Sequence, residues 1–348
     1  MTVSRDEVVS AYRMLLGREP ENEAVVEGHR AARDWPALRD AFVNSEEYRA
    51  TTGRVRSHLD SLYDGVTAGD EILLRRHLDP GEAESGFVRN FLGTRMKAEF
   101  TLPTVALSGR VYSDIPTVVG DYHAESIEFV GLLKAIEAGS GSFVAVELGA
   151  GWGSWSVTAG HVARRLGRAP IRLYAVEAGA ARMDNIRQHY RNNGFDPDAH
   201  QIVNAAMGPV DGFALFPRVT ADDLWGEQAI FLSAADSEVP ERPGYDMVPS
   251  ITLGTLLRSE TLVDLIHFDI QGAEQDTIAD AIDVLNEKVR YMIIGTHGRV
   301  IEGSIMAILS EHGWWLENDQ PARIKPSAHG REEIVVDGTQ VWRNPRLS

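Results

Sequence analysis

Residues 142–153 read SFVAVELGAGWG, and residues 154–167 continue as SWSVTAGHVARRLG. The apolar run 142–148 predicts a buried strand, and the second stretch predicts an amphipathic helix that ends at Gly167. Between them lies a turn of the form G-x-G-x-G, with glycines at 149, 151 and 153. Such a turn lets backbone approach a ligand and directs helix N–H groups toward it. We therefore expect a polar or anionic group to bind at this turn.

The pattern continues on the C-terminal side of this turn. Further strands are predicted at 171–177, 200–206, 263–270 and 289–296, and helices at 180–194, 275–288 and 304–313. Strands that alternate with helices imply right-handed crossovers and a mostly parallel, doubly wound sheet of the Rossmann-like α/β class. The tail segments 314–318, 332–337 and 340–344 predict short antiparallel strands at one edge.

Composition limits the functional classes. The 34 basic and 51 acidic residues give a net charge of −17, which disfavours nucleic acid and anionic lipid as partners. The chain has no cysteine, so disulfides, thiolate metal sites and a cysteine nucleophile are excluded. No run approaches the roughly 20 apolar residues that span a bilayer, and the first thirty residues contain no apolar leader. We expect a cytoplasmic protein without a membrane span.

The length of 348 residues suggests two domains, at roughly 150 residues per domain. Apolar positions at helical spacing predict a helical module over residues 1–50. There MLLGREPENEAVVEG (14–28) and FVNSEEY (42–48) resemble the short helical module DUF4214, which implies docking or substrate tethering; a purely structural appendage is the alternative. Helical spacing also predicts a helical connector over 51–110, with Phe87, Phe91 and Leu92 on one helix, before a cofactor domain over 111–348.

Two cofactor families use a glycine turn of this kind. A dinucleotide fingerprint needs a third glycine in the spacing G-x-G-x-x-G, whereas Trp155 and Ser156 follow here. Glu147, two residues before Gly149, would repel a diphosphate and suits the cationic amine of a methionine moiety. The E-x-G-x-G-x-G pattern resembles motif I of class I S-adenosylmethionine-dependent methyltransferases. An NAD(P)-dependent oxidoreductase is the alternative.

Other positions complete the expected cofactor site. Glu177 ends the second strand, where an acid binds ribose hydroxyls in both cofactor families. Asn204 and Ala205 follow the third strand, at the expected adenine edge, although Asn204 alternatively serves as a turn residue. Tyr122 and His123 could reach the methionine end, unless Asp121 only caps a helix. Trp152 is expected to pack on the cofactor or to cover the sheet. The cofactor-binding residues are therefore Glu147, Gly149, Gly151, Trp152, Gly153, Glu177, Asn204, Ala205, Tyr122 and His123.

Four later segments resemble the FkbM methyltransferase family over about residues 120–320. They are SITLGTLL (250–257), VDLIHFDIQGAEQDTI (263–278), YMIIGTHG (291–298) and LSEHGWW (309–315). The chain departs from the family at Ile270, Ala273 and Thr296. The resemblance implies O-methylation of a hydroxyl on a sugar, glycolipid or other small metabolite.

Catalytic groups are expected at the carboxyl ends of the strands. Asp269 lies at the end of its strand and is a candidate base or orienting group, or else bonds loop backbone. His297 follows the next strand and is a candidate base with a near-neutral pKa. Gln271 and Glu274 extend the motif as support for substrate or structure, and the default for Glu274 is stabilising a helix dipole. His267, on the same strand face, is expected to be a satisfied interior histidine.

A metal is possible but not favoured. Asp246, Asp269, Glu274 and His297 offer suitable ligand atoms, but they lack a metal-binding spacing. The insertion 208–250 is expected to shape the acceptor pocket, with aromatic residues that either stack on a sugar ring or pack in a core: Phe213, Phe216, Trp225, Phe231 and Tyr245. A non-catalytic binding protein that keeps the cofactor fold is a further alternative. The acceptor's identity and the oligomeric state have no signal in the sequence.

Overall fold

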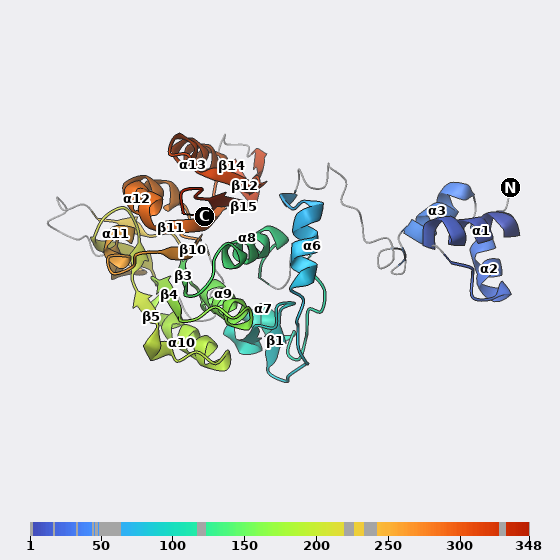
Figure 1. The fold of residues 1–348 in the computed structure, drawn as a ribbon, viewed down its shortest axis with the longest axis horizontal. Helices are drawn as coiled ribbons and strands as arrows, with labels where there is room; N and C mark the ends of the chain where they lie inside the picture. The colour runs from blue at the N-terminus through green and yellow to red at the C-terminus, as the bar shows by residue number, and fades with distance from the viewer. Residues whose placement is uncertain are drawn as a thin grey trace. The chain divides into compact units, whose positions relative to one another are not determined.

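The structure is a computed structural model of the chain. It describes residues 3–16, 18–32, 34–43, 45, 48, 64–116, 123–218, 226–232, 242–326 and 332–347. Contacts divide the chain into two compact units, Met1–Ser61 and Leu62–Ser348, and each unit is described by itself (Figure 1). Asp121, Tyr122 and Trp225, which the sequence analysis names, lie outside the described residues.

The N-terminal unit is built from helices. They are α1 (Arg5–Ala11), the π-helical turn η1 (Tyr12–Leu16), α2 (Glu23–Arg30) and α3 (Trp35–Val43). Ser4 and Glu7 form a capping box at the start of α1, which satisfies N–H groups that a helix leaves unpaired at its N-terminus. The apolar faces meet in a small core that contains Val8, Tyr12, Val26, Leu38 and Phe42. The predicted boundary at residue 50 and the resemblance to DUF4214 stay predictions.

A seven-stranded sheet forms the centre of the second unit (Figure 1). Its order is β12-β15-β11-β10-β3-β4-β5. The strands are β3 (Phe143–Leu148), β4 (Ile171–Glu177), β5 (Gln201–Asn204), β10 (Val263–Phe268), β11 (Val289–Thr296), β12 (Trp315–Gln320) and β15 (Gly338–Arg343). Strands β3, β4, β5, β10 and β11 pair in parallel, and β15 is antiparallel to both β11 and β12. The predicted doubly wound α/β fold is confirmed.

Helices cover both faces of this sheet (Figure 1). One apolar core lies under α8 (Ser126–Glu137), α9 (Ser154–Arg165) and α10 (Met183–Asn192), and a second lies under α11 (Leu253–Leu256), α12 (Glu274–Lys288) and α13 (Arg299–Glu311). All six residues of β3 are buried, which explains why five of them are apolar instead of alternating with polar residues; the exception is Glu147. Burial of Leu148 and Val146 contributes about 1.5–3 kcal/mol for each side chain.

The strand order reverses next to β3. From β3 the chain proceeds through β4 to β5 on one side, and it then returns to β10 and β11 on the other side. The crossover helices after β3 and β10 therefore leave on opposite faces of the sheet. In open α/β sheets a ligand binds in the crevice outside the carboxyl ends of the strands at such a reversal. This topology places the candidate site above the ends of β3, β4 and β10.

The insertion 208–250 and the residues that flank it form a second, four-stranded sheet of order β6-β9-β7-β8. Its strands are β6 (Ala206–Met207), β7 (Gly212–Pro217), β8 (Ile230–Phe231) and β9 (Tyr245–Ile251). Two of its aromatic side chains differ in exposure, since Phe213 is 52% exposed and Phe216 is 7% exposed.

The prediction for the tail is wrong in one part. Segments 314–318 and 340–344 pair in the main sheet through β12 and β15, as expected. Segment 332–337 does not join that edge. Strand β14 (Glu332–Val336) instead pairs with β13 (Arg323–Pro326) as a separate hairpin, because residues 323–326 offer a nearer partner in sequence.

Residues 64–116 belong to the second unit, and the prediction of helix there is wrong for residues 87–97. The segment contains α6 (Ala68–Arg76), β1 (Phe87–Arg89), β2 (Arg95–Lys97), the 3-10 turn η2 (Ala98–Phe100) and α7 (Leu102–Val105). The Asn90 side chain accepts N–H groups of Leu92 and Thr94, and Gly93 has a φ of +90°, so local turn chemistry produces a β-hairpin. Phe91 and Leu92 are still fully buried, but in the main core.

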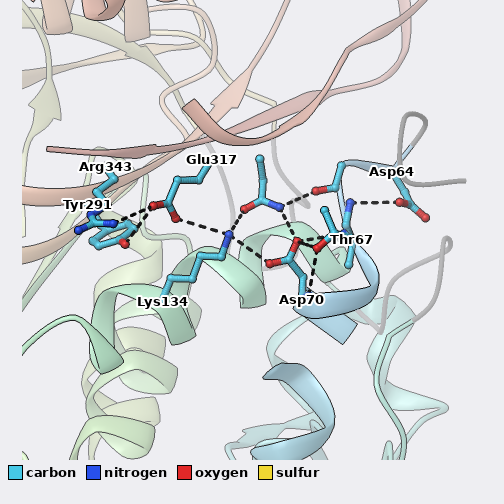
Figure 2. A network of polar contacts seen from close by, with 10 residues as sticks. Asp64, Thr67, Asp70, Lys134, Tyr291, Glu317 and Arg343 are labelled. Atoms are coloured by element: carbon cyan, nitrogen blue, oxygen red, sulfur yellow. Dashed lines mark hydrogen bonds and ion pairs between the residues drawn. The ribbon is translucent and has the colours of Figure 1, made fainter. Parts of the chain in front are cut away.

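A polar network fastens α6 to the sheet (Figure 2). Lys134 of α8 lies 3.1 Å from Asp70 of α6 and 2.7 Å from the Asn318 side-chain oxygen of β12. The Asn318 amide donates to Asp70 at 2.9 Å and to the Gly65 carbonyl at 2.7 Å. Burial would raise the pKa of Asp70, but the Thr67 N–H and the Lys134 charge outweigh it and hold the pKa below its ordinary value.

Candidate functional site

The turn after β3 brings two strand ends together. Gly149, Gly151 and Gly153 have φ values of +76°, +57° and +80°, a region that favours glycine. A Cβ atom at Gly149 would lie 1.8 Å from the Asp269 carbonyl oxygen, so only glycine allows the β3 and β10 ends to approach this closely. A Cβ at Gly151 would instead meet open space. The turn therefore has one face packed on β10 and another open to a ligand.

A cavity of about 470 Å³ lies at this position, within the size range of small-molecule sites. Most of the sequence-predicted residues line it: His123, Glu147, Gly149, Gly151, Trp152, Glu177, Ala205, Asp269, Gln271 and His297. Gly153, Asn204 and Glu274 lie behind the wall and are not among the lining residues. The predicted Tyr122 lies outside the described residues. Phe216, Glu227 and Ala229 bring parts of the insertion to the wall.

Glu147 caps the helix that follows the turn. One carboxylate oxygen accepts the Trp155 N–H at 2.9 Å, and the other accepts the N–H and hydroxyl of Ser156 at 2.8 and 2.6 Å. Burial raises the pKa of Glu147 despite these hydrogen bonds. Because Glu147 accepts the N–H groups of Trp155 and Ser156, its carboxylate faces the positive end of the α9 dipole. A contact with a methionine amine stays a prediction for this residue.

Glu177 lies in an ion-pair chain at one end of the cavity. Its carboxylate accepts the Gly151 N–H at 2.8 Å and the Gly179 N–H at 2.7 Å. Arg182, at the end of the 3-10 turn η3 (Ala180–Arg182), lies 3.5 Å from Glu177 and 3.1 Å from Glu227. Burial raises the pKa of Glu177, and the Arg182 charge opposes that shift. Arg182 and Glu227 are lining residues that the sequence analysis missed, because they are 45 positions apart and belong to no motif.

Asn204 is bonded to backbone. Its amide donates to the carbonyl oxygens of Glu177 and Ala178 at 2.9 and 3.0 Å. These bonds join the end of β5 to the end of β4. The neighbouring Ala205 lines the cavity, whereas Asn204 does not. The geometry therefore favours the turn interpretation of Asn204.

A second chain of charges occupies the end of β10 and β11. His297 lies 3.3 Å from Asp269 through its Nε2 atom and 3.0 Å from Glu274 through its Nδ1 atom. The Gln271 amide nitrogen lies 2.6 Å from Asp269 and 2.8 Å from His297 Nε2. Gln271 is the one non-glycine residue with positive φ, +54°, in the described part of the chain. The four sequence-predicted residues of this motif are therefore brought together.

The expected near-neutral pKa of His297 is wrong. Burial lowers the pKa of a histidine, but the hydrogen bonds and charges of Asp269 and Glu274 outweigh that effect and raise the pKa of His297 to about 10. The same ion pair holds the pKa of Asp269 below its ordinary value, against the effect of burial. With this pKa His297 is protonated at neutral pH and lies between two carboxylates, which disfavours the predicted general-base role.

Glu274 supports this arrangement from inside the protein. It is fully buried and accepts N–H groups of Ile270 and Gly272 at 3.0 Å each, besides the His297 contact. Its carboxylate shapes the turn between β10 and α12 and orients His297. The default expectation of a helix-dipole contact alone is therefore too simple.

Aromatic and histidine side chains form the wall beside α8 and α9. The His267 ring stacks on Trp155 with centroids 4.9 Å apart, and its Nε2 lies 3.0 Å from a Glu128 oxygen. His267 is therefore buried as its mid-strand position predicts, but it lines the cavity and its Nδ1 atom has no hydrogen-bond partner among the described residues, so the expectation of a satisfied histidine is met only in part. His123 lies near this wall, with ring centroids 5.6 Å from Trp155 and 6.3 Å from Trp152.

Negative charge dominates the cavity wall. Its carboxylate side chains are Glu125, Glu128, Glu147, Glu177, Glu227, Asp269 and Asp337. Among the described residues of the wall, Arg182 is the permanent cation, and the charged form of His297 joins it. Such a wall attracts a cationic ligand and repels a diphosphate.

Neither a cluster of metal ligands nor a membrane-spanning helix is found in the described part of the chain. Within the described ranges, no group of three or more His, Asp or Glu side chains is arranged to hold a metal ion. Asp246, one of the candidate ligands, is exposed and pairs with Arg218 at 2.7 Å. Among the helices of the described segments, none has the length and apolar character needed to cross a membrane.

A comparison with curated proteins finds a relative that is similar over most of this chain. No family model matches the chain. A protein of Jannaschia sp. (strain CCS1) named "Putative methyltransferase" is 31% identical over 268 residues, which cover 76% of this chain and 95% of the relative.

Two solved structures are more distant. Precorrin-6y C5,15-methyltransferase from Geobacter metallireducens GS-15 has 11% identity and a TM-score of 0.36, with coverage of 64% of this chain and 88% of that one. Methyltransferase FkbM from Methylobacillus flagellatus KT has 13% identity and a TM-score of 0.36, with coverage of 58% and 43%.

Proposed function

The chain belongs to the methyltransferase family of its Jannaschia relative, and from that premise we propose that it transfers the methyl group of S-adenosylmethionine to a hydroxyl of a sugar, glycolipid or other small metabolite. The observation that supports this most is the acid-lined cavity at the strand reversal, with a glycine turn on one side and Asp269 on the other. Membership of the FkbM branch and a cytoplasmic location belong to the same proposal.

The residues present fit this cofactor. Open space in front of Gly151 leaves room for a ligand against the backbone, and the buried Glu177 carboxylate suits ribose hydroxyls. Ala205 would face the adenine side, and Glu147, Trp152 and His123 would lie toward the methionine part. When bound, S-adenosylmethionine supplies a methyl group activated by its positively charged sulfur.

Asp269 is the residue that we assign to the acceptor hydroxyl. Its side chain is 42% exposed, and its contacts with the described residues Gln271 and His297 involve Oδ1, so Oδ2 is the atom that we assign to an incoming hydroxyl. Oδ2 accepts a hydrogen bond from that hydroxyl, orients its oxygen and takes the proton as the oxygen loses it. Because the pKa of Asp269 is low, orientation contributes more than early proton removal.

His297, Gln271 and Glu274 act through Asp269. The His297 cation and the Gln271 amide hold the Asp269 carboxylate in one position, and the buried Glu274 holds His297. These residues therefore preorganise the hydroxyl site before the acceptor binds.

Calorimetric titration with S-adenosylhomocysteine and with NAD tests the proposal. We expect binding of the first and none of the second. Gly151→Arg should abolish binding, because its side chain would fill open space in the cavity. Gly167→Arg is the matched control, since Gly167 also has positive φ and open space but does not line the cavity. NAD binding would favour the oxidoreductase alternative.

A hydroxylated glycan panel then separates an enzyme from a binding protein. Mass spectrometry should detect a methylated product for at least one acceptor. Binding of the cofactor without turnover on any acceptor would favour a non-catalytic role with the helical N-terminal unit as the working surface.

A further inference from the structure

The end of the cavity at Glu177 has an unusual charge arrangement. Glu177 is 3% exposed and Arg182 is 7% exposed, so both charges are taken out of water. Arg182 contacts Glu177 at 3.5 Å and Glu227 at 3.1 Å, and the Glu227 side chain is 19% exposed. The arginine is therefore shared between a buried carboxylate and a more accessible one.

A ribose-binding carboxylate must be ionised, because only the ionised form accepts hydrogen bonds at all its remaining lone pairs. Burial disfavours ionisation, since a charge loses its hydration in the protein interior. The Gly151 and Gly179 N–H groups offset part of that loss for Glu177. They are neutral dipoles, so a full positive charge nearby has the larger effect.

In the described part of the chain, the charged side chains that act on Glu177 come from two segments. Arg182 comes from η3, and Glu227 comes from residues 226–232 at the end of the insertion. The turn after β3 contributes backbone N–H groups, and β5 contributes Asn204, whose amide bonds backbone carbonyls. Arg182 favours the ionised form of Glu177, whereas Glu227 opposes it both by repulsion and by competing for Arg182.

We propose that Arg182 is a positioning residue for the cofactor: it keeps the Glu177 carboxylate charged inside the cavity wall so that it accepts the ribose hydroxyls, and Glu227 tunes that effect from the insertion. This inference rests on the proposed role of Glu177 in binding S-adenosylmethionine. It assigns the insertion, at residue 227, to the nucleoside end of the site and not only to the acceptor.

The test is the affinity for S-adenosylhomocysteine, measured by calorimetry as a function of pH. Wild-type affinity should be constant near neutral pH and should fall at acidic pH, when Glu177 takes up a proton. We call this fall in affinity the acid limb of the pH profile. Arg182→Gln should move this acid limb to higher pH, with about a tenfold loss of affinity for each pH unit below the new pKa. Arg182→Lys keeps the charge and should move the limb back toward the wild-type position.

Glu227→Gln provides a test of opposite sign. It removes the competing carboxylate, so the acid limb should move to lower pH and affinity at neutral pH should be retained. A merely structural ion pair would give the reverse, because loss of either partner would weaken binding. An acid limb that moves upward or stays in place in Glu227→Gln overturns the inference, even if Arg182→Gln fails to fold.

Two failures remain distinguishable. Wild-type protein that does not bind S-adenosylhomocysteine overturns the proposed function and this inference together. Wild-type binding with the same acid limb in Arg182→Gln overturns the inference alone.

Discussion

The two ends of the cavity each hold one cation between two carboxylates, and the cations differ in kind. At the β4 end Arg182 lies between Glu177 and Glu227, and at the β10 end His297 lies between Asp269 and Glu274. In both chains one carboxylate is deeply buried and the other is more exposed. At the first end the more buried carboxylate, Glu177, lines the cavity. At the second end the more buried carboxylate, Glu274, does not line it, and the more exposed Asp269 does.

This difference separates binding from chemistry. Arginine stays charged at every accessible pH, so at the Arg182 end only the two carboxylates titrate. Histidine is a titratable cation, and its charge at the β10 end exists only because two carboxylates raise its pKa to about 10. We therefore connect the first end with the proposed binding of the cofactor and the second with the proposed orientation and deprotonation of the acceptor hydroxyl by Asp269.

The largest effect is expected at the accessible carboxylate of the histidine end. Asp269→Asn keeps the size of the side chain but removes the charge that orients the acceptor hydroxyl. Turnover should fall by about 10²–10⁴-fold, the usual contribution of a positioned acid or base. Affinity for S-adenosylhomocysteine should change little, because the nucleoside end is untouched.

Asp246→Asn is the matched control for this prediction. Asp246 is exposed, pairs with Arg218 and does not line the cavity, so turnover should remain at the wild-type level. Equal turnover of Asp269→Asn and Asp246→Asn would remove Asp269 from the mechanism.

The next effect concerns stability. Glu274→Ala leaves the His297 cation without its buried partner and leaves the Ile270 and Gly272 N–H groups without an acceptor. Loss of one partner of a buried pair costs about 3–5 kcal/mol in unfolding free energy. Urea denaturation measures this loss. The control is Glu311→Ala, because Glu311 is exposed at the end of α13. This variant should change the free energy of unfolding by less than about 0.5 kcal/mol.

These assignments divide into those that the sequence predicts and those that it cannot. The order of strands and helices around β3 follows from buried apolar runs, and the glycine turn and Asp269 follow from their positions at strand ends. Local periodicity fails where turn chemistry competes with it. Phe87 and Phe91 share helical spacing, but the Asn90 side chain and Gly93 close a hairpin between β1 and β2.

The charge state of the site is a property of tertiary structure. Nothing in the sequence links Arg182 to Glu227, because the contact depends on the insertion folding back to the cavity. The pKa of His297 depends likewise on a turn that aims Glu274 at its Nδ1 atom. A motif gives the residue types of such a site, whereas distances and burial decide which of them carry a proton.

The pH dependence of stability distinguishes the two cations. An unfolded histidine loses its proton above about pH 6.5, whereas His297 in the folded protein keeps it until about pH 10. The stabilisation is therefore complete below pH 6.5 and is lost as pH rises toward 10, with a slope of up to about 1.4 kcal/mol per pH unit.

Urea denaturation between pH 7 and 9 measures this slope. His297→Gln should be less stable at pH 7 and should lack this part of the decline. Arg182→Gln should keep the decline, since arginine does not titrate in this range. Identical slopes in the wild type and His297→Gln would show that His297 is neutral in the folded protein.

The smallest effect is expected from Asn204, next to the arginine end. Its amide bonds two backbone carbonyls, so Asn204→Ala should cost about 1 kcal/mol in stability. Affinity for S-adenosylhomocysteine should fall by less than about threefold, because the side chain does not line the cavity. Calorimetry beside the Asn193→Ala variant, which also loses backbone contacts but lies away from the cavity, separates the two effects. A loss above about tenfold in Asn204→Ala alone would mean that its amide turns toward the adenine, and recognition at this end would then depend on a neutral hydrogen bond as well as on the Glu177 charge.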